Sequence, residues 1–441
     1  MRSNPFKNRV KEKGKINIIT LGCSKNLVDS EVLLGQLKGN GLDAVHEEEA
    51  SDAKTVVVNT CGFIDEAKEE SIQTILTYAE KREAGEIDKL IVTGCLSERY
   101  KTDLIQEIPE VDAFFGTQDL PHLVQELGAD YKSELVGERP VAEGSHYAYL
   151  KIAEGCNRPC SFCAIPLMRG KHRSRNIESL VEEAKFLVQK GVKELMLIAQ
   201  DLTYYGIDLY GRRKLNELLQ SLGEVEGLEW IRLHYAYPSG FPVEILPTIR
   251  TQENICNYLD IPLQHIADPV LKHMRRGINK KRTEALIDTI RAEIPNITLR
   301  TTLLVGHPGE SQQDHEELLE FVSRRKFDRL GIFTYSHEEG TYAGNSFEDQ
   351  ISEETKETRK EELMELQQEI SLELNRKKVG RVYKTLVDSQ SDGYFIGRTE
   401  ADSPEVDNEV LIYAKNLTIG DFYSVEITDA MEYDLIGKIA K

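Results

Sequence analysis

The stretch EGCNRPCSFC, residues 154–163, places three of the chain's seven cysteines within eight positions. We call these residues, Cys156, Cys160 and Cys163, the loop trio. The run YAYLKIA just before them is aromatic and aliphatic, which is typical of a strand, and Gly155 then turns that strand into a loop. Thiolates are soft ligands that prefer zinc, copper(I) or iron–sulfur clusters. A lone cuboidal cluster normally takes four ligands, and this loop offers three.

Structural zinc is the simplest alternative for the CxxxCxxC spacing, with His172 as the possible fourth ligand of a Cys₃His site. Two features disfavour zinc. The cysteines do not form the paired CxxC of zinc ribbons, and Phe162 is a bulky apolar residue that a zinc knuckle does not require. A four-iron cluster on three thiolates leaves one iron open, and an open iron can chelate the amino and carboxylate groups of S-adenosylmethionine.

Length and composition indicate an ordinary soluble protein. The 441 residues exceed one typical domain and predict two or three, each able to bury a core. The formal net charge of -20 disfavours indiscriminate binding to nucleic acid or anionic membranes and suits a basic partner better. The positively charged residues 1–15 are followed by no secretory apolar core, so we expect a cytoplasmic protein. Reduced thiols that serve metal or redox chemistry are then expected, not a disulfide framework.

Three earlier segments share one pattern, in which a short apolar run is followed at once by a cysteine. They are KINIITLGC, TVVVNTCG and KLIVTGC, and their cysteines, Cys23, Cys61 and Cys95, are called the strand-end trio below. Helical patterns at 26–37 and 65–82 lie between them, so the alternation predicts βαβ units and a parallel sheet. Ligands gather beyond the carboxyl ends of such strands, where this trio would converge. The alternatives are buried free cysteines, or disulfides that an odd trio cannot complete.

A domain boundary is expected near Arg139–Ser145, and strand and helix patterns alternate again beyond the cysteine loop. The expected helices are 177–191, 214–223, 243–250, 281–294 and 311–326, and the strands after the first are 194–199, 230–235, 258–262, 297–305 and 329–335. Six strands with intervening helices predict an α/β fold with a partial (β/α)6 barrel. Active sites of that architecture lie at the carboxyl ends of the strands, where the loop trio would fall.

The rest of the chain predicts one charged helix and a small β-barrel. The helix, 351–378, carries an apolar stripe too short for a coiled coil, so we expect it to pack on the larger barrel. Short strands at 381–387, 394–398, 410–412, 422–427 and 435–439 predict a barrel of the oligonucleotide-binding kind. From Val379 onward six basic residues stand against twelve acidic ones, which favours a basic protein surface over RNA as partner.

The CxxxCxxC loop and the partial barrel resemble the radical S-adenosylmethionine enzymes. That resemblance implies a 4Fe-4S cluster on the loop trio, which passes an electron to S-adenosylmethionine and so generates a 5′-deoxyadenosyl radical that abstracts hydrogen from an unactivated carbon. It also implies that Phe162 lies near the adenine and that Gln200 and Gly306, after the second and fifth strands, line the cofactor. Glycine loops such as 306–310 also occur as simple turns, which is the alternative for Gly306.

The strand-end trio makes the resemblance specific to one subfamily of these enzymes. Three domains, expected at 14–138, 142–375 and 379–441, are similar over nearly the whole chain to the methylthiotransferases, whose last domain is a small β-barrel called TRAM. The resemblance implies a second 4Fe-4S cluster on the strand-end trio, whose open iron could carry the sulfur to be installed. Making a methylthioether at a C–H bond needs a hydrogen abstractor, a sulfur source and a methyl donor, and two such clusters with S-adenosylmethionine supply all three.

Two motifs separate the main branches of that family, which modify either an adenosine of transfer RNA or an aspartate of small-subunit ribosomal protein twelve. The run LGCSKNLVDSE at 21–31 and the pair Gln200-Asp201 are similar to the ribosomal-protein branch, because the transfer-RNA branch typically has Asn after Gln. The motif at 169–175 is shared by both. His307 departs from the aromatic residue expected there, and Cys256 matches no motif and is expected to be an ordinary thiol.

These features together predict an enzyme that adds a methylthio group to the β-carbon of one aspartate in that ribosomal protein, using two 4Fe-4S clusters and S-adenosylmethionine. The expected partners are the ribosomal protein, a sulfur donor and an electron donor, with no membrane and no nucleic acid as direct substrate, and the enzyme is expected to be a monomer. No residue is assigned to the substrate carbon. A transfer-RNA methylthiotransferase is the nearest alternative. An iron–sulfur carrier and a zinc-stabilised RNA-binding module are alternatives of other classes.

Overall fold

The computed structural model describes residues 14–48, 52–142 and 144–440, so most of the basic amino terminus lies outside the described residues. The described chain divides into two compact units. The amino-terminal unit extends to Val141 and also includes the segment Leu167–Arg169. The carboxyl-terminal unit comprises Ala142–Pro166 and the chain from Gly170 onward.

The amino-terminal unit is built on a five-stranded sheet in which all neighbouring strands are parallel. In spatial order the strands are β2 (Ala44–His46), β1 (Ile16–Thr20), β3 (Thr55–Thr60), β4 (Lys89–Gly94) and β5 (Ala113–Phe114). The helices are α1 (Ser24–Gly39), α2 (Asp65–Glu83), α3 (Cys95–Glu107), α4 (Leu120–Glu126) and the 3-10 helix η1 (Ser133–Val136). Val57 enters one apolar cluster while Val56 and Val58 enter another, so helices cover both faces of β3. The expected βαβ units are confirmed.

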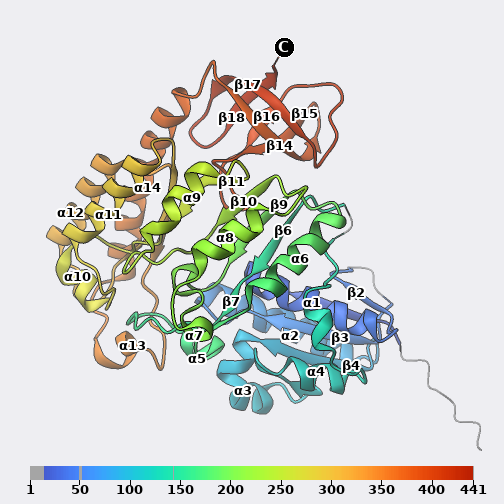
Figure 1. Ribbon diagram of the computed structural model, residues 1–441. Coiled ribbons are helices and arrows are strands. Elements are labelled where there is room, and N and C mark those ends of the chain that lie inside the picture. The colour runs from blue at the N-terminus through green and yellow to red at the C-terminus, as the bar shows by residue number, and fades with distance from the viewer. Residues whose placement is uncertain (1–13, 49–51, 143, 441) are drawn as a thin grey trace, which may run out of the picture. The chain divides into compact units, whose positions relative to one another are not determined.

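The carboxyl-terminal unit begins with a six-stranded parallel sheet whose strands follow one another in chain order (Figure 1). They are β6 (Tyr147–Lys151), β9 (Glu194–Ile198), β10 (Trp230–Leu233), β11 (Ile255–Asp260), β12 (Thr298–Val305) and β13 (Arg329–Thr334). The helices between these strands are α5 (Ile165–Arg169), α6 (Ile177–Gln189), η2 (Leu202–Tyr204), α7 (Ile207–Tyr210), α8 (Leu215–Gly223), η3 (Val243–Ile245), α9 (Leu246–Thr251), α10 (Asp268–His273), α11 (Lys280–Glu293) and α12 (Gln312–Arg325), and α13 (Tyr342–Ser346) follows β13. The expected six-strand α/β architecture is confirmed.

Several elements differ from the expected boundaries by a few residues, and proline accounts for part of the difference in two of them. The strand expected at 258–262 is β11, which ends at Asp260. Pro262 has no N–H to donate to a neighbouring strand, so it cannot extend the ladder. The helix expected at 243–250 is a 3-10 turn followed by α9, with Pro247 in the first turn of α9, where its missing N–H costs nothing.

The last elements are the long helix α14 (Glu353–Arg376) and a closed five-stranded barrel. Ser352 caps α14 by accepting from the Thr355 N–H, and Leu363 and Ile370 are buried where the helix packs against α12 and β13. The expected helix packed on the larger barrel is confirmed. The small barrel, in the order β14 (Val382–Ser391), β15 (Tyr394–Thr399), β16 (Val410–Ile412), β18 (Leu435–Ile439), β17 (Phe422–Ala430), has its own apolar core.

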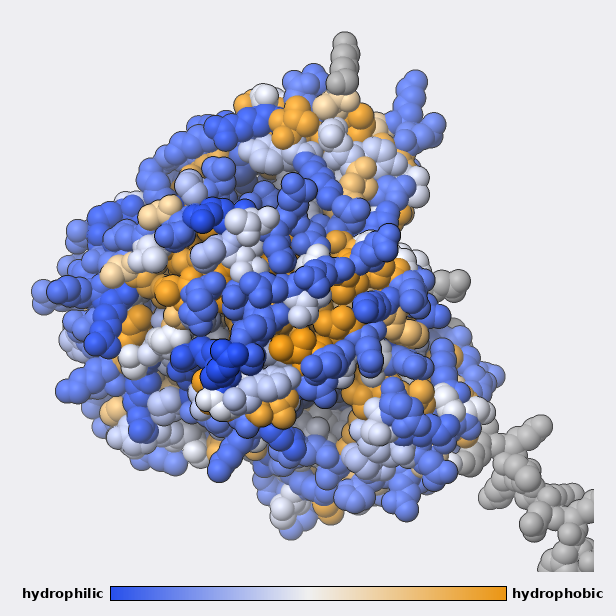
Figure 2. Space-filling view, viewed as in Figure 1, coloured by the Kyte–Doolittle hydropathy of each residue, from blue (hydrophilic) through white to orange (hydrophobic). Residues whose placement is uncertain are grey.

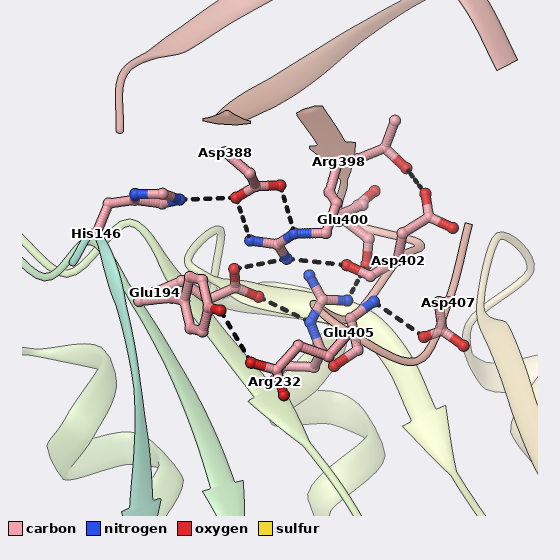
Figure 3. Close-up of polar contacts among 12 residues, drawn as sticks. His146, Glu194, Arg232, Asp388, Arg398, Glu400, Asp402, Glu405 and Asp407 are labelled. Carbon is pink, nitrogen blue, oxygen red and sulfur yellow. Dashed lines mark hydrogen bonds and ion pairs between the residues drawn. The ribbon is translucent and has the colours of Figure 1, made fainter. Parts of the chain in front are cut away.

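The small barrel is fastened to the amino ends of the sheet strands by buried charges (Figure 3). Arg398 of β15 pairs with Glu194, the first residue of β9, at 2.8 Å, and with Asp388 at 2.7 Å. The loop after β15 continues these contacts, since Asp402 pairs with Arg329, the first residue of β13. This attachment lies at the end of the sheet opposite the carboxyl ends of the strands, so it leaves the expected active-site end free.

The surface in view is mostly hydrophilic, with apolar residues in separate patches (Figure 2). Among the described residues no helix is both long and apolar enough to span a bilayer.

Candidate functional site

The loop trio follows β6 and the two-residue strand β7 (Ala153–Glu154), which pairs with β8 (Arg173–Ser174). Gly155 has a φ of +80°, and a Cβ there would overlap the carbonyl oxygen of Lys171, so this position requires glycine. The Cys156 N–H donates to the Gly170 carbonyl at 3.0 Å. Backbone contacts therefore hold the loop, as the sequence predicted, at the end of the first sheet strand.

The cysteines of the loop trio are half-buried, and their thiols interact electrostatically. Burial raises the pKa of Cys156 to about 11 and that of Cys163 to about 12, and the charge of Cys160 adds to the rise in both. All three cysteines are free. Closely packed buried thiolates need a cationic group to keep them deprotonated, which a bound metal supplies.

Two side chains from distant segments hold Cys160. Arg276 Nη1 donates to Cys160 Sγ at 3.2 Å, and the Tyr237 hydroxyl lies 3.5 Å from the same sulfur and donates to the Arg276 carbonyl at 2.8 Å. The guanidinium groups of Arg276 and Arg158 lie 4.2 and 4.1 Å from the centroid of the Tyr237 ring, in cation–π range. Sequence reasoning missed Tyr237 and Arg276, because neither belongs to a local motif.

Asp201 gives the loop trio a further anchor. Its carboxylate accepts from Arg158 Nε at 2.6 Å and caps η2 by accepting from the Thr203 N–H at 2.8 Å. An Asn at this position would keep the cap but lose the charge that pairs with Arg158. The residue that distinguishes the two branches in the sequence is therefore a structural partner of the cysteine loop.

The three residues expected to line a cofactor lie at or beyond the carboxyl ends of sheet strands. Phe162 is half-buried in the cysteine loop and packs against the apolar cluster that contains Tyr335. Gln200 follows β9, and its Nε2 donates to Glu154 Oε1 at 2.7 Å. Its Oε1 is buried and has no hydrogen-bond partner among the described residues, which leaves one acceptor available to a ligand.

Gly306 begins an ordered loop after β12. Its φ is +75° and a Cβ would overlap the Lys356 side chain, so glycine is required there. The buried Glu310 carboxylate accepts from the N–H groups of Gly306 and His307 at 2.5 and 3.2 Å. The loop is thus closed by its own carboxylate.

His307 occupies the position where an aromatic residue was expected, and it packs as one. Its ring makes edge contacts with Phe162, Tyr335 and Phe347 at centroid distances of 6.3, 5.3 and 6.0 Å. Burial lowers its pKa to about 4, so the imidazole is neutral at pH 7. His307 therefore keeps the ring contact with Phe162 that the expected aromatic residue would make.

The strand-end trio follows three neighbouring strands of one parallel sheet. Cys23 comes after β1 as the N-cap of α1, Cys61 directly follows β3, and Cys95 follows β4 as the first residue of α3. Because β1, β3 and β4 are adjacent and parallel, these positions lie at one edge. The approach is close, since a Cβ on Gly22 would lie 2.6 Å from Cys61 Cβ.

Burial also dominates the electrostatics of the strand-end trio. It raises the pKa of Cys95 to about 12, against the opposing charge of Arg169, and it raises the pKa of Cys61. In the part of the chain that the structure describes, no three His, Cys, Asp or Glu side chains already stand in a metal-binding arrangement. The fit of a cluster to either trio therefore rests on free soft ligands gathered at one place, whose side chains must turn to converge.

Two polar residues with no role assigned from sequence contact the strand-end trio. Arg169 Nε donates to Cys95 Sγ at 3.2 Å, and the Asn26 carboxamide lies against the same sulfur and the Cys61 strand end. The only signal for them is their place in the motifs at 21–31 and 169–175.

Two other residues were singled out by sequence. His172 lies beside the cysteine loop, because its backbone N–H donates to Asn157 Oδ1 at 3.1 Å. Its Nε2 is hydrogen-bonded to Ser174 Oγ at 3.1 Å and its ring packs on Tyr204, so Nε2 already has a protein partner. Cys256 is buried in an apolar cluster with Trp230 and Tyr258 and is an ordinary core thiol, as expected.

Many of the acidic residues of the small barrel already have partners elsewhere in the carboxyl-terminal unit. Seven of its acidic residues contact groups outside that barrel, through side chains or main chain: Asp388, Glu400, Asp402, Glu405, Asp407, Asp421 and Glu432. Glu405, for example, accepts from the Tyr149 hydroxyl at 3.1 Å. The charge excess available to a basic partner is therefore smaller than the count from sequence.

Comparison with known families divides the chain into three parts. Residues 15–116 match the family described as Uncharacterized protein family UPF0004, residues 150–322 match the Radical SAM superfamily, and residues 379–440 match the TRAM domain.

Two relatives are similar over nearly the whole chain. The ribosomal protein uS12 methylthiotransferase RimO of Cytophaga hutchinsonii is 59% identical over 432 residues, which cover 98% of this chain and 99% of that protein. The RimO of Bacteroides thetaiotaomicron is 53% identical over 427 residues, which cover 96% of this chain and 98% of that protein.

Solved structures share the fold at low identity. The radical S-adenosylmethionine methyltransferase TsrM of Kitasatospora setae, with cobalamin and a [4Fe-4S] cluster bound, is similar with a TM-score of 0.56 and 13% identity, over 75% of this chain and 74% of that one. The cobalamin-dependent S-adenosylmethionine radical enzyme OxsB is similar with a TM-score of 0.53 and 12% identity, over 80% of this chain and 56% of that one.

Proposed function

We propose that this chain, which belongs to the ribosomal protein uS12 methylthiotransferase family, attaches a methylthio group to the β-carbon of one aspartate of that ribosomal protein. It is a radical S-adenosylmethionine methylthiotransferase. The observation that carries the choice of acceptor is the identity of 59% to a uS12 methylthiotransferase over 98% of the chain. The pair Gln200-Asp201 supports it, because Asp201 is the partner of Arg158 in the cysteine loop.

We place one 4Fe-4S cluster on the loop trio and a second on the strand-end trio. When bound, the first cluster with S-adenosylmethionine would supply the hydrogen-abstracting radical and the second would hold the sulfur to be installed. The chain's own contribution at the loop trio is to anchor the backbone through Gly155 and to orient Cys160 with Arg276 and Tyr237.

Phe162, Gln200 and Gly306 would hold S-adenosylmethionine. The unpartnered Oε1 of Gln200 would accept a hydrogen bond from the amino or ribose groups, while Glu154 fixes the other end of the amide. Gly306 would let the backbone approach the cofactor, and Phe162 would pack on the adenine, with the His307 ring in edge contact with Phe162. These roles position the cofactor, and no residue is assigned to the substrate carbon.

We assign separate roles to three segments of the chain, 14–138, 142–375 and 379–441. The first would carry the sulfur-holding cluster, the second the radical chemistry, and the third would complete the second by closing the amino ends of its strands. The five acidic residues of the small barrel that make no polar contact outside it in the described structure, among them Asp392 and Asp429, would leave a surface suited to the basic acceptor. A ribosomal acceptor would place the reaction in the cytoplasm.

The acceptor is tested by incubating reconstituted protein, S-adenosylmethionine and a reductant with either uS12 or transfer RNA, and measuring mass. We expect a methylthio mass gain on one aspartate of uS12 and none on transfer RNA; the reverse result would overturn the proposal. A Cys256→Ala variant is the matched control, because it removes a buried cysteine outside both trios and should keep the activity. An iron–sulfur carrier would form no 5′-deoxyadenosine in this assay.

A further inference from the structure

Arg169 directs one N–H at a cysteine of the strand-end trio. It folds with the amino-terminal unit and its side chain is 2% exposed. Nε donates to Cys95 Sγ at 3.2 Å, Nη1 donates to Asp29 Oδ2 at 2.6 Å, and Nη2 donates to the carboxamide oxygen of Asn26. A guanidinium is planar and rigid, so two bonds at its terminal nitrogens fix the direction of the third donor. That third donor faces the sulfur.

Asn26 connects the same group to all three strand ends. Its Nδ2 donates to the carbonyls of Leu21, at the end leading to Cys23, and of Thr60, just before Cys61, at 2.7 and 3.0 Å. Its Oδ1 accepts from Arg169 and lies 3.9 Å from Cys95 Sγ. The Asn59 amide in turn holds the Asn26 carbonyl at 2.9 Å. Asn26 and Arg169 therefore form one buried network that touches the loop of every cysteine in the trio.

We propose that Arg169 is a positioning residue for the cluster placed on Cys23, Cys61 and Cys95, and that its Nε–H···Sγ hydrogen bond to Cys95 raises the reduction potential of that cluster. Hydrogen bonds to cluster sulfurs withdraw electron density and stabilise the reduced state. The inference rests on the proposed second cluster and adds the residue that orients and tunes it.

A purely structural arginine is the alternative. Arg169 already pairs with Asp29, and a buried guanidinium with a carboxylate partner needs no further function. The two roles differ in one measurable respect. A structural arginine affects whether the unit folds, whereas a positioning arginine changes the potential of a cluster that is still present.

The test isolates the strand-end cluster by replacing Cys156, Cys160 and Cys163 with Ala in the full-length protein. Arg169→Gln and Arg169→Lys are added to that background, and iron, sulfide and the reduction potential are measured by an EPR-monitored titration. Arg82→Gln is the matched control, because Arg82 belongs to the same unit and carries the same charge but pairs with Asp112 at the surface.

We expect Arg169→Gln to lower the potential at unchanged iron content and Arg82→Gln to leave it unchanged. Arg169→Lys is expected to lower the potential as well, because one ammonium cannot bond Asn26 and Asp29 and reach the sulfur in a fixed direction. An unchanged potential in Arg169→Gln would overturn the inference. If Arg169→Gln loses iron, the reduction potential of Arg169→Lys is used instead, and an unchanged potential in that variant would overturn the inference. Absence of iron from the parent background would refute the second cluster itself, which is a separate outcome.

Discussion

The two cysteine trios that we propose as cluster sites are assembled in different ways. The loop trio is local, because eight consecutive positions carry all three thiols and one glycine turn with a backbone anchor holds them. The strand-end trio is assembled from β1, β3 and β4, and it exists only because parallel strands end at the same edge. Each trio nevertheless has one buried arginine that donates to a sulfur at 3.2 Å, Arg276 in one and Arg169 in the other.

The way in which each trio is assembled should decide how sensitive it is to changes elsewhere in the fold. A loop within one segment survives small shifts of the surrounding sheet. A set made by three strand ends depends on the register of every strand between them, so packing changes in the sheet should reach it.

The largest expected effect comes from removing the loop trio. The variant Cys156→Ala, Cys160→Ala, Cys163→Ala should lose all activity and about half of the bound iron, because the strand-end trio would keep its own cluster. Iron and sulfide assays check this. Loss of all the iron would contradict two independent sites, and the Cys256→Ala variant controls for the loss of a buried thiol.

Asp402→Asn tests whether the scaffold of the loop trio can be weakened without touching the other unit. Burial raises the pKa of Asp402, but the Arg329 ion pair outweighs it and the net pKa is lowered. Breaking this buried pair should reduce the free energy of unfolding of the carboxyl-terminal unit by about 3–5 kcal/mol. Denaturant unfolding measures it, and Lys384→Gln, which breaks an exposed pair with Glu229, should cost below about 1 kcal/mol.

The same pair predicts a pH dependence. A carboxyl with a lowered folded pKa contributes stability above its unfolded pKa of about 4 and loses it as the pH falls through the folded value. Wild-type protein should therefore lose stability below about pH 4 more steeply than Asp402→Asn. Equal slopes in unfolding experiments at low pH would contradict the ion pair as its source.

Substitution of one glycine beside each trio should reduce iron binding at that trio alone. Gly94→Ala would place a Cβ 2.5 Å from Asn59 Oδ1 at a φ of +103°, and Gly155→Ala would overlap the Lys171 carbonyl. Each should destabilise its own unit by about 2–3 kcal/mol and reduce iron at its own trio only. Gly85→Ala is the control for strain alone, since it has a φ of +72° with nothing within 4 Å and should cost about 1 kcal/mol. Iron loss at both trios from either variant would contradict their independence.

The smallest expected effect is that of His307→Phe. Because His307 packs through edge contacts with neighbouring aromatic rings and is neutral, Phe should replace it at a cost below about 1.5 kcal/mol. Calorimetry and turnover measure this. A large loss of turnover with unchanged stability would instead indicate that the bond between His307 Nε2 and Ser161 Oγ, at 3.3 Å, matters to the loop.

Most of the element order could be predicted from sequence, and the exceptions have local causes. Apolar runs and helical periodicity located the strands and helices, because each reflects burial of one segment. Pro247 and Pro262 shifted boundaries that periodicity alone cannot place. Tyr237 and Arg276 escaped prediction because they contact Cys160 only through the folded barrel, from positions that carry no pattern.

The residue pattern was enough to predict the type of chemistry. Two sets of three cysteines, one of them in CxxxCxxC spacing, offer the soft ligands that iron–sulfur clusters prefer. The side chains that contact these cysteines, and the partners of the acidic residues, became visible only in the folded chain. Arg169, Asn26 and Arg276 meet their sulfurs, and Asp402 meets Arg329, across long separations in the chain. Such contacts form when burial makes an unpaired polar group costly, and that penalty arises only after the elements have packed.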